Sequence, residues 1–197
     1  MLEVELKSVV DDVRLRRSAV EAAGGKLVYE GRLLDLRYDV PDRSLMMRDH
    51  VLRLRVYESA NSRKVLLDWK GETRYEDGYK VREELSTPVD DPEVLRQIVE
   101  RLGYVVTTEI DRQIAQYELD GVTVRFEEYP EMDALVEVEG EPEAIERVIS
   151  LIGMPRTGFT SERLLDFMIR YEARTGRRAV LSRNEQQPSA FSHRPSA

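Results

Sequence analysis

Charged and apolar residues alternate along one stretch after another of this 197-residue chain. In VLRLRVYE, residues 51–58, Arg53 and Arg55 fall on one side of an extended chain, and the neighbouring Leu and Val residues fall on the other. The pattern predicts a strand with one charged and one apolar face. Taken alone, such a strand fits a sheet whose charged face meets water as well as a barrel whose charged face points inward.

Six segments share this alternation, and each places at least two charged residues on one face. These residues are Glu3, Glu5 and Lys7; Arg53 and Arg55; Asp68 and Lys70; Lys80, Arg82 and Glu84; Arg125 and Glu127; and Glu137 and Glu139. A face that met only water would show many Ser, Thr, Asn and Gln residues in place of this concentration of Arg and Glu. The agreement among the segments favours a charged interior, in which charges must be paired, hydrated or bound to ions.

Eight segments are expected to be strands, a number that can close into a barrel. They span residues 3–7, 31–40, 50–58, 63–71, 79–86, 110–119, 121–129 and 134–140. The expected helices run from Asp11 or Asp12 to Gly24, from Pro92 to Gly103, from Pro142 to Gly153, and onward from Ser161 as an N-cap. The predicted fold class is α+β, a barrel with a charged interior and flanking helices.

Composition excludes several kinds of chemistry. There is no cysteine, and the two histidines are His50 and His193, so a thiol nucleophile, a Cys-ligated metal and a histidine-rich site have no residues to use. The net charge of −8 argues against nucleic-acid binding. No apolar run approaches the roughly 18 residues that would span a bilayer. We therefore expect a cytoplasmic protein without a nucleic-acid or membrane partner.

The chain is expected to form one domain over residues 1–174. The remaining residues, 175–197, are polar, basic and without periodicity, so we expect them to be disordered or loosely docked.

A tunnel of mixed charge suits a metal-bound polyanion. Carboxylates are hard ligands that suit Mg²⁺ or Mn²⁺. Lys and Arg donate to closely spaced negative charges. The candidate carboxylates are Glu3, Glu5, Glu137 and Glu139, and the candidate donors are Lys7, Arg53, Arg55, Lys70, Arg82 and Arg112. Polyphosphate with a divalent metal fits both sets.

These residues resemble the pattern of the CYTH superfamily, the triphosphate tunnel metalloenzymes. That group includes class IV adenylate cyclases, thiamine triphosphatases and inorganic triphosphatases. Its ExExK signature is matched at the start of the chain by Glu3, Glu5 and Lys7. The order of later motifs is also similar, over about residues 1–172: LLDLRYDVPD, VLRLR, DWKG, VREEL, IDRQIAQY, VRFEEY and LVEVEG.

The resemblance implies an eight-stranded antiparallel tunnel and a role for each candidate residue. The metal, Mg²⁺ or Mn²⁺, would be held by Glu3, Glu5, Glu127, Glu137 and Glu139. The triphosphate would be bound by Lys7, Arg53, Arg55, Lys70, Arg82 and Arg112. The residues expected to be catalytic are Glu5, Lys7, Arg55 and Glu137.

Four positions depart from the family pattern. Ile110 stands where a second basic residue precedes the Arg of IDRQ, which would loosen triphosphate binding. Glu127 replaces an Asp, Asp133 replaces a Gly, and Arg37 replaces a Tyr. Glu127 keeps a carboxylate, so it stays in the predicted metal set.

Three functions are compatible with these residues. The first is a metal-dependent hydrolase of a triphosphate-containing small molecule, such as tripolyphosphate, thiamine triphosphate or a nucleoside triphosphate. It is preferred because no adenine pocket is recognisable and the HF dipeptide upstream of ExExK in some class IV cyclases is missing. The alternatives are an adenylate cyclase and a non-catalytic module that binds polyphosphate or nucleotide. The sequence leaves a homodimer open.

Overall fold

The structure, a computed structural model, describes residues 2–183 and contains nine strands and five α-helices in that range. The strands are β1 (Leu2–Val9), β2 (Lys26–Asp39), β3 (Val51–Glu58), β4 (Arg63–Lys70), β5 (Arg74–Glu76), β6 (Tyr79–Pro88), β7 (Val105–Leu119), β8 (Val122–Glu128) and β9 (Leu135–Glu139). The helices are α1 (Val13–Ala22), α2 (Ser44–Met47), α3 (Pro92–Arg101), α4 (Pro142–Leu151) and α5 (Leu164–Thr175). A short 3-10 turn, Arg156–Gly158, precedes α5.

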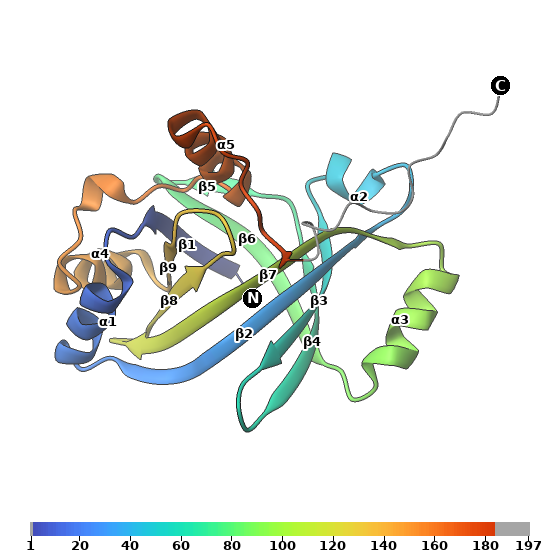
Figure 1. Cartoon of the computed structure of the whole chain (residues 1–197), viewed down its shortest axis with the longest axis horizontal. Helices are drawn as coiled ribbons and strands as arrows, with labels where there is room; N and C mark the ends of the chain where they lie inside the picture. The colour runs from blue at the N-terminus through green and yellow to red at the C-terminus, as the bar shows by residue number, and fades with distance from the viewer. Residues whose placement is uncertain (1, 184–197) are drawn as a thin grey trace.

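Eight of the strands close into a single antiparallel barrel (Figure 1). Their order is β1, β9, β8, β7, β2, β3, β4 and β6, and a pairing between β1 and β6 closes the ring. The ninth strand, β5, pairs only with β6 and lies outside the ring. The predicted fold class, an eight-stranded antiparallel tunnel with flanking helices, is therefore confirmed.

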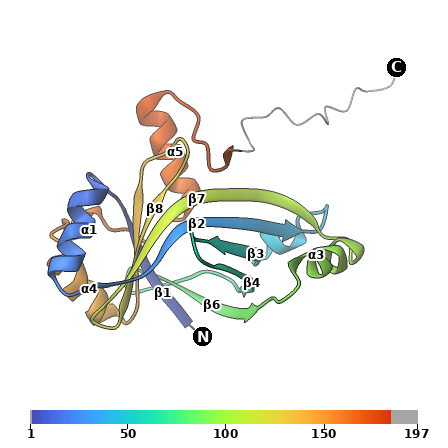
Figure 2. The ribbon, with the colours of Figure 1, turned by 60° about the horizontal axis from the view of Figure 1, so that its bottom comes forward.

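Helices cover the apolar outer face of the barrel. Figure 2 shows α1 and α4 together at one end of the molecule and α3 at the other. Ile145 and Ile149 of α4 are almost fully buried and belong to one cluster with Leu6 and Val138 of the barrel. At the opposite end, Val99 of α3 belongs to a second buried cluster with outward residues of β3 and β4. These contacts fix which side of each strand faces out, so the alternate charged residues must face in.

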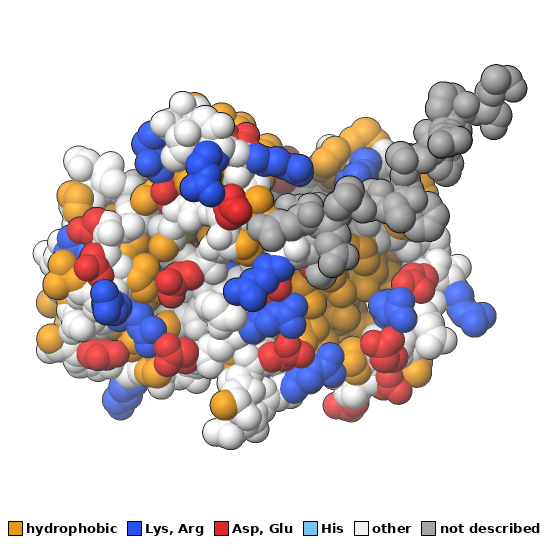
Figure 3. Space-filling view, viewed as in Figure 1, with side chains coloured by type: hydrophobic (Ala, Val, Ile, Leu, Met, Phe, Trp, Pro, Cys, Tyr) orange, Lys and Arg blue, Asp and Glu red, His pale blue; other side chains and the backbone are white. Residues whose placement is uncertain are grey.

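The barrel interior, unlike the outer surface, concentrates buried charge. Figure 3 shows acidic and basic side chains interspersed over one outer face, as on an ordinary protein surface. The inward residues are instead buried and charged: Glu3, Glu5, Asp35, Arg53, Arg55, Asp68, Lys70, Lys80, Arg82, Arg112, Arg125, Glu127 and Glu137. The expected charged interior is thus observed.

Several predicted boundaries were wrong. β2 begins at Lys26 rather than at residue 31, because Gly31 lies within the strand instead of starting it. A Cβ at this position would lie 2.3 Å from the carbonyl oxygen of Glu58, so the close approach of β3 requires glycine. β7 likewise begins at Val105, earlier than expected, and β5 and α2 were not predicted.

The predicted N-cap of the last helix was also wrong. α5 begins at Leu164, and the Asp166 carboxylate in its first turn accepts a 2.9 Å hydrogen bond from the backbone N–H of Arg163, the residue before the helix. Ser161 lies before this turn.

Residues 176–183 do not behave as a loose tail. Ala179 and Leu181 are buried, Val180 forms a bridge with Glu131, and the Leu181 carbonyl accepts a hydrogen bond from the Asp111 backbone. These contacts dock this part of the predicted tail on the rest of the chain. The rest of the predicted tail, residues 184–197, lies outside the described residues. Across residues 2–183, no helix is both long enough and apolar enough to cross a bilayer.

The N-cap of α1 gives a first testable result. The Asp12 carboxylate accepts a 3.0 Å hydrogen bond from the Leu15 backbone, as the sequence predicted for Asp11 or Asp12. We expect Asp12→Ala to lower the free energy of unfolding by about 1 kcal/mol, because one helical N–H loses its acceptor. Asp12→Asn keeps an accepting oxygen and should stay close to wild type. Urea denaturation of the three proteins measures the difference, and equal midpoints would contradict the assignment.

Candidate active site

The barrel encloses a cavity of about 340 Å³ that is lined by ten basic and seven acidic side chains. We call it the first cavity. Its walls are inward residues of the barrel strands, and residues of α2 and α5 lie at its edge. A second cavity of about 500 Å³ opens on another part of the same interior, and Glu3 and Arg125 line both.

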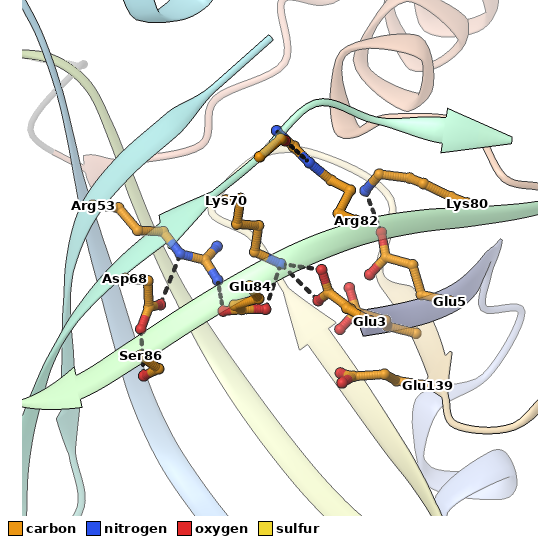
Figure 4. Close-up of polar contacts among 12 residues, drawn as sticks. Glu3, Glu5, Arg53, Asp68, Lys70, Lys80, Arg82, Glu84, Ser86 and Glu139 are labelled. Atoms are coloured by element: carbon orange, nitrogen blue, oxygen red, sulfur yellow. Dashed lines mark hydrogen bonds and ion pairs between the residues drawn. The ribbon is translucent and has the colours of Figure 1, made fainter. Parts of the chain in front are cut away.

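The three residues of the ExExK pattern lie on the inner face of β1. Glu3 accepts hydrogen bonds of 2.6 and 2.5 Å from the Lys70 ammonium group (Figure 4). Glu5 accepts from Lys80 and, at 3.0 Å, from Lys7. β1 lies between β6 and β9, and Leu6 packs outward against α4, so the alternate residues have no other direction in which to point.

Glu137 on β9 completes this group. One of its carboxylate oxygens lies 2.5 Å from the Lys7 ammonium group, and the other pairs with Arg125. Burial alone would raise the pKa of Glu137, but the positive charges of Arg125 and Lys7 outweigh burial and hold this pKa well below its usual value. Burial alone would lower the pKa of Lys7, but the negative charges of Glu137 and Glu5 outweigh burial and raise this pKa above its ordinary value. Both side chains are therefore ionised at neutral pH.

Glu139 differs from its neighbours on β9. Burial raises its pKa to about 7, and the nearby negative charges of Glu137 and Glu3 act in the same direction. The Arg125 guanidinium lies 3.6 Å from the Glu139 carboxylate, and its positive charge offsets only part of this rise in pKa. This corner of the interior consequently has an excess of negative charge that a cation would relieve.

Asp35 on β2 lies at the centre of the opposite wall and is fully buried. Its Oδ2 atom lies 3.3 Å from Arg112 and 3.5 Å from Arg53. Burial alone would raise the pKa of Asp35, but these arginines outweigh burial and lower it. Arg112 also donates a 3.0 Å hydrogen bond to Glu127, which fixes its guanidinium in the wall.

The predicted site residues divide between the two cavities. The first cavity is lined by Glu3, Glu5, Lys7, Arg53, Lys70, Arg82, Arg112, Glu127 and Glu137. Arg55 and Glu139 line only the second cavity. Arg55 pairs there with Asp68 and, at 3.1 Å, with Glu84, so it lines a different cavity from Arg53, with which it was expected to bind one triphosphate.

Arg82 is held mainly by backbone. Its guanidinium donates to the carbonyl oxygens of Gly71 and Asp49. Asp49 in turn accepts 2.8 Å hydrogen bonds from the Thr73 backbone and from Arg163, just before α5. Arg82 therefore helps to join the loops at the edge of the first cavity.

The interior also contains residues that were not among the predicted site residues. Arg125 pairs with Glu137, Lys80 pairs with Glu5, and Tyr129 donates a 2.6 Å hydrogen bond to Glu127. Arg37 lines the first cavity from β2. Arg125 and Lys80 had a signal in the sequence, since both share an alternating face with predicted residues. Tyr129 lies beyond the end of β8, where alternation gives no direction.

The metal prediction can be compared with this arrangement. Among the described residues, no three carboxylate or histidine side chains converge closely enough to form a metal site. The predicted carboxylates are paired with lysine and arginine side chains instead. The donor chemistry nevertheless suits a hard divalent cation, since the carboxylates of Glu3 and Glu137 are close enough to Glu139 to raise its pKa. The residues thus fit a metal in kind and charge.

Comparisons with known proteins agree with this geometry. The CYTH domain model matches residues 1–152. A Methanocaldococcus jannaschii protein, named as an adenylate cyclase candidate, is 25% identical over 139 residues, which cover 71% of this chain and 77% of that protein.

Two solved structures show the same fold. An adenylate cyclase candidate from Vibrio parahaemolyticus has a TM-score of 0.72 at 17% identity, covering 86% of this chain and 98% of its own. An adenylyl cyclase candidate from Hippeastrum, described as having a dominant triphosphatase activity, has a TM-score of 0.59 at 18% identity, covering 91% and 98%. With the family model matched over most of its length, this chain belongs to the CYTH domain family.

Proposed function

We propose that this protein is a divalent-metal-dependent hydrolase of a triphosphate-containing small molecule. Enzymes of the family act as triphosphatases or cyclases. The observation that supports hydrolysis here is the first cavity itself, whose ten basic side chains outnumber its seven carboxylates inside a closed barrel. Such an interior favours a ligand with several closely spaced negative charges.

Phosphoryl transfer asks a protein mainly for positioning and charge neutralisation. Arg53 and Arg112 can give planar, bidentate contacts to phosphoryl oxygens, and both are pre-positioned by Asp35. Lys70 supplies a point charge from β4 while Glu3 and Glu84 hold its ammonium group (Figure 4). The donors are therefore fixed before substrate arrives, which lowers the cost of ordering them in the transition state.

The metal would be held by Glu5 and Glu137, with Glu3, Glu127 and Glu139 as further donors. A divalent cation, when bound, would neutralise phosphate charge and lower the pKa of a water molecule. Metal dependence is general among tunnel enzymes of this family, and the choice of Mg²⁺ or Mn²⁺ is part of the proposal. The Lys7 ammonium group lies between Glu5 and Glu137, and its charge helps to keep Glu137 ionised, ready to bind a cation.

A second candidate, adenylate cyclase, is favoured by the edge of the first cavity. Met46, Leu164 and Leu165 line the cavity beside its charged residues. Met46 and Leu165 are exposed, so they offer an apolar surface to an organic group attached to the phosphates. A nucleoside or a thiamine group would suit that surface equally well, and tripolyphosphate would leave it unused.

One experiment separates these functions. Phosphate release and reaction products are measured for tripolyphosphate, thiamine triphosphate and ATP with Mg²⁺, Mn²⁺ or EDTA. We expect metal-dependent release of orthophosphate from at least one substrate and no cyclic AMP by HPLC. Cyclic AMP with pyrophosphate would establish the cyclase instead. Binding of all three substrates without any turnover would leave a non-catalytic module and overturn the hydrolase proposal.

A further inference from the structure

Arg37 lines the first cavity from β2 without a carboxylate partner. Of the ten basic side chains that line this cavity, eight have a carboxylate oxygen within 4.0 Å. In the part of the chain that the structure describes, the two without one are Arg37 and Arg43, and Arg43 is exposed. The Nε atom of Arg37 is buried and makes no hydrogen bond. Arg37 is thus a cavity-lining cation with a buried, unused donor.

The neighbours of Arg37 make its charge more costly. Arg37 lies directly opposite Arg53 in the pairing of β2 with β3. Like charges in directly opposite strand positions repel each other. Burial lowers the pKa of Arg37, the charges of Arg53 and Arg112 act in the same direction against the effect of Asp35, and the resulting pKa is about 10. The guanidinium is still positive at neutral pH, so the repulsion is present in the ligand-free protein.

Two neighbouring arginines share a carboxylate that Arg37 does not reach. Asp35 lies within ion-pair distance of Arg53 and Arg112, but Arg37 is beyond that distance. Arg53 and Arg112 also reach Asp68 and Glu127, whereas Arg37 does not. We call Arg37, Arg53 and Arg112 the arginine trio. Arg53 and Arg112 are balanced by carboxylates, whereas the charge of Arg37 is not, and an anion with several oxygens would offset it.

Arg37 also extends the basic surface toward α2. It lies two residues before Asp39, whose carboxylate accepts hydrogen bonds from the N–H groups of Leu45 and Met46 in α2. Arg112 pairs with Leu33, which lies four residues before Arg37 on β2, or about 13 Å from it along the strand. The inner face of β7 has Ile110 between Thr108 and Arg112, so β7 provides no cation at that level. Arg37 provides it from the neighbouring strand.

We propose that Arg37 binds a phosphoryl group of the substrate and makes the first cavity selective for triphosphates over diphosphates. The inference rests on the proposed function in taking a polyphosphate as the ligand. A diphosphate can be held by the inner cations, Lys7, Lys70 and Arg53. A third phosphoryl group extends the chain toward α2, where Arg37 supplies donors that no carboxylate uses.

Binding measured without metal tests this role. Calorimetry in EDTA gives the Kd of tripolyphosphate and of pyrophosphate for wild type, Arg37→Gln and Arg37→Lys. We expect Arg37→Gln to weaken tripolyphosphate binding about tenfold or more and pyrophosphate binding less than about threefold, because a charge-assisted contact to one phosphoryl group is lost. Arg37→Lys keeps the charge and should recover part of the affinity. Arg101→Gln, an exposed arginine on α3, is the matched control and should bind both anions as wild type does.

Thermal unfolding provides a second readout that a merely structural role would not give. Removing a partly buried cation that repels Arg53 should leave the ligand-free Arg37→Gln protein as stable as wild type or more stable, while its gain in Tm from tripolyphosphate is smaller. A residue that only supported the fold would lower the Tm of the free protein.

The outcomes separate this inference from the proposed hydrolysis. Equal tripolyphosphate affinities for wild type and Arg37→Gln would overturn the role of Arg37 and leave hydrolysis standing. Arg37-dependent binding in a protein that hydrolyses nothing would support the role of Arg37 and overturn the hydrolase. If Arg37→Gln lost affinity for tripolyphosphate and pyrophosphate equally, the proposed selectivity would be overturned. A wild-type protein that binds neither anion would overturn both proposals.

Discussion

Glu137→Gln should abolish metal-dependent triphosphatase activity while the barrel keeps its fold. The Glu137 carboxylate balances Lys7 and Arg125 and is held ionised by them. An amide of the same shape leaves no cavity, but it removes an anionic ligand from a site that prefers hard, charged oxygens. Because changes behind the ligands already cost 10–100-fold in metal affinity or activity, we expect turnover to fall at least about 100-fold.

The measurement is phosphate release as a function of Mg²⁺ and Mn²⁺ concentration, with circular dichroism to monitor the fold. Glu5→Gln should behave alike, because Glu5 is buried beside the same lysine. Glu118→Gln changes an exposed glutamate on β7 in the same way and should keep full activity. Full activity in both Glu137→Gln and Glu5→Gln would refute the metal assignment.

Asp35→Asn should produce the largest loss of stability. Asp35 is fully buried and is the shared partner of Arg53 and Arg112, so a neutral side chain leaves two guanidinium groups short of negative charge. Removing one partner of a buried ion pair typically costs about 3–5 kcal/mol. Because Arg53 and Arg112 keep their contacts with Asp68 and Glu127, we expect about 3 kcal/mol. Urea denaturation at pH 7 measures this difference.

The pH dependence checks the cause of that loss. The folded protein lowers the pKa of Asp35 below its ordinary value of 3.8. A lowered carboxyl pKa stabilises the fold above that value, and the contribution is lost as pH falls through the folded pKa. The gap between wild type and Asp35→Asn should therefore be complete at neutral pH and shrink below about pH 4. Asp77→Asn, at an exposed turn, is the control, with an expected change within about 0.5 kcal/mol. A gap that persists unchanged into acid would show that charge is not the reason.

Alternation along the strands was sufficient to predict the interior. Glu5 and Glu137 could be placed on it because a side-chain period of two leaves no choice once Leu6 and Val138 face the helices. Alternation gives the face of a strand, however, and not its height along the barrel. Tilt and stagger between strands decide that height, which is why Arg55 and Glu139 line the second cavity and not the first.

Other features depend on contacts that no local pattern encodes. The four residues of α2 are too few to show helical periodicity, and the Asp39 carboxylate that binds the N–H groups of Leu45 and Met46 lies six and seven residues away in sequence. The same limit applies to Arg37. In the sequence, Arg37 is a departure from the family pattern in LLDLRYDVPD. Only the paired strands show that it lies opposite Arg53 and on the strand next to Ile110.

The pairing of β1 with both β6 and β9 has a consequence for the order of folding. Residues 2–9 are separated from these partners by more than 70 and 120 positions, and they close the ring while supplying Glu3, Glu5 and Lys7. Such distant pairings form slowly, because chain entropy is lost before the contacts compensate for it. Closure of the barrel and assembly of the anion site are then one kinetic event. In refolding experiments, the capacity to bind tripolyphosphate should emerge only in the last, slowest phase.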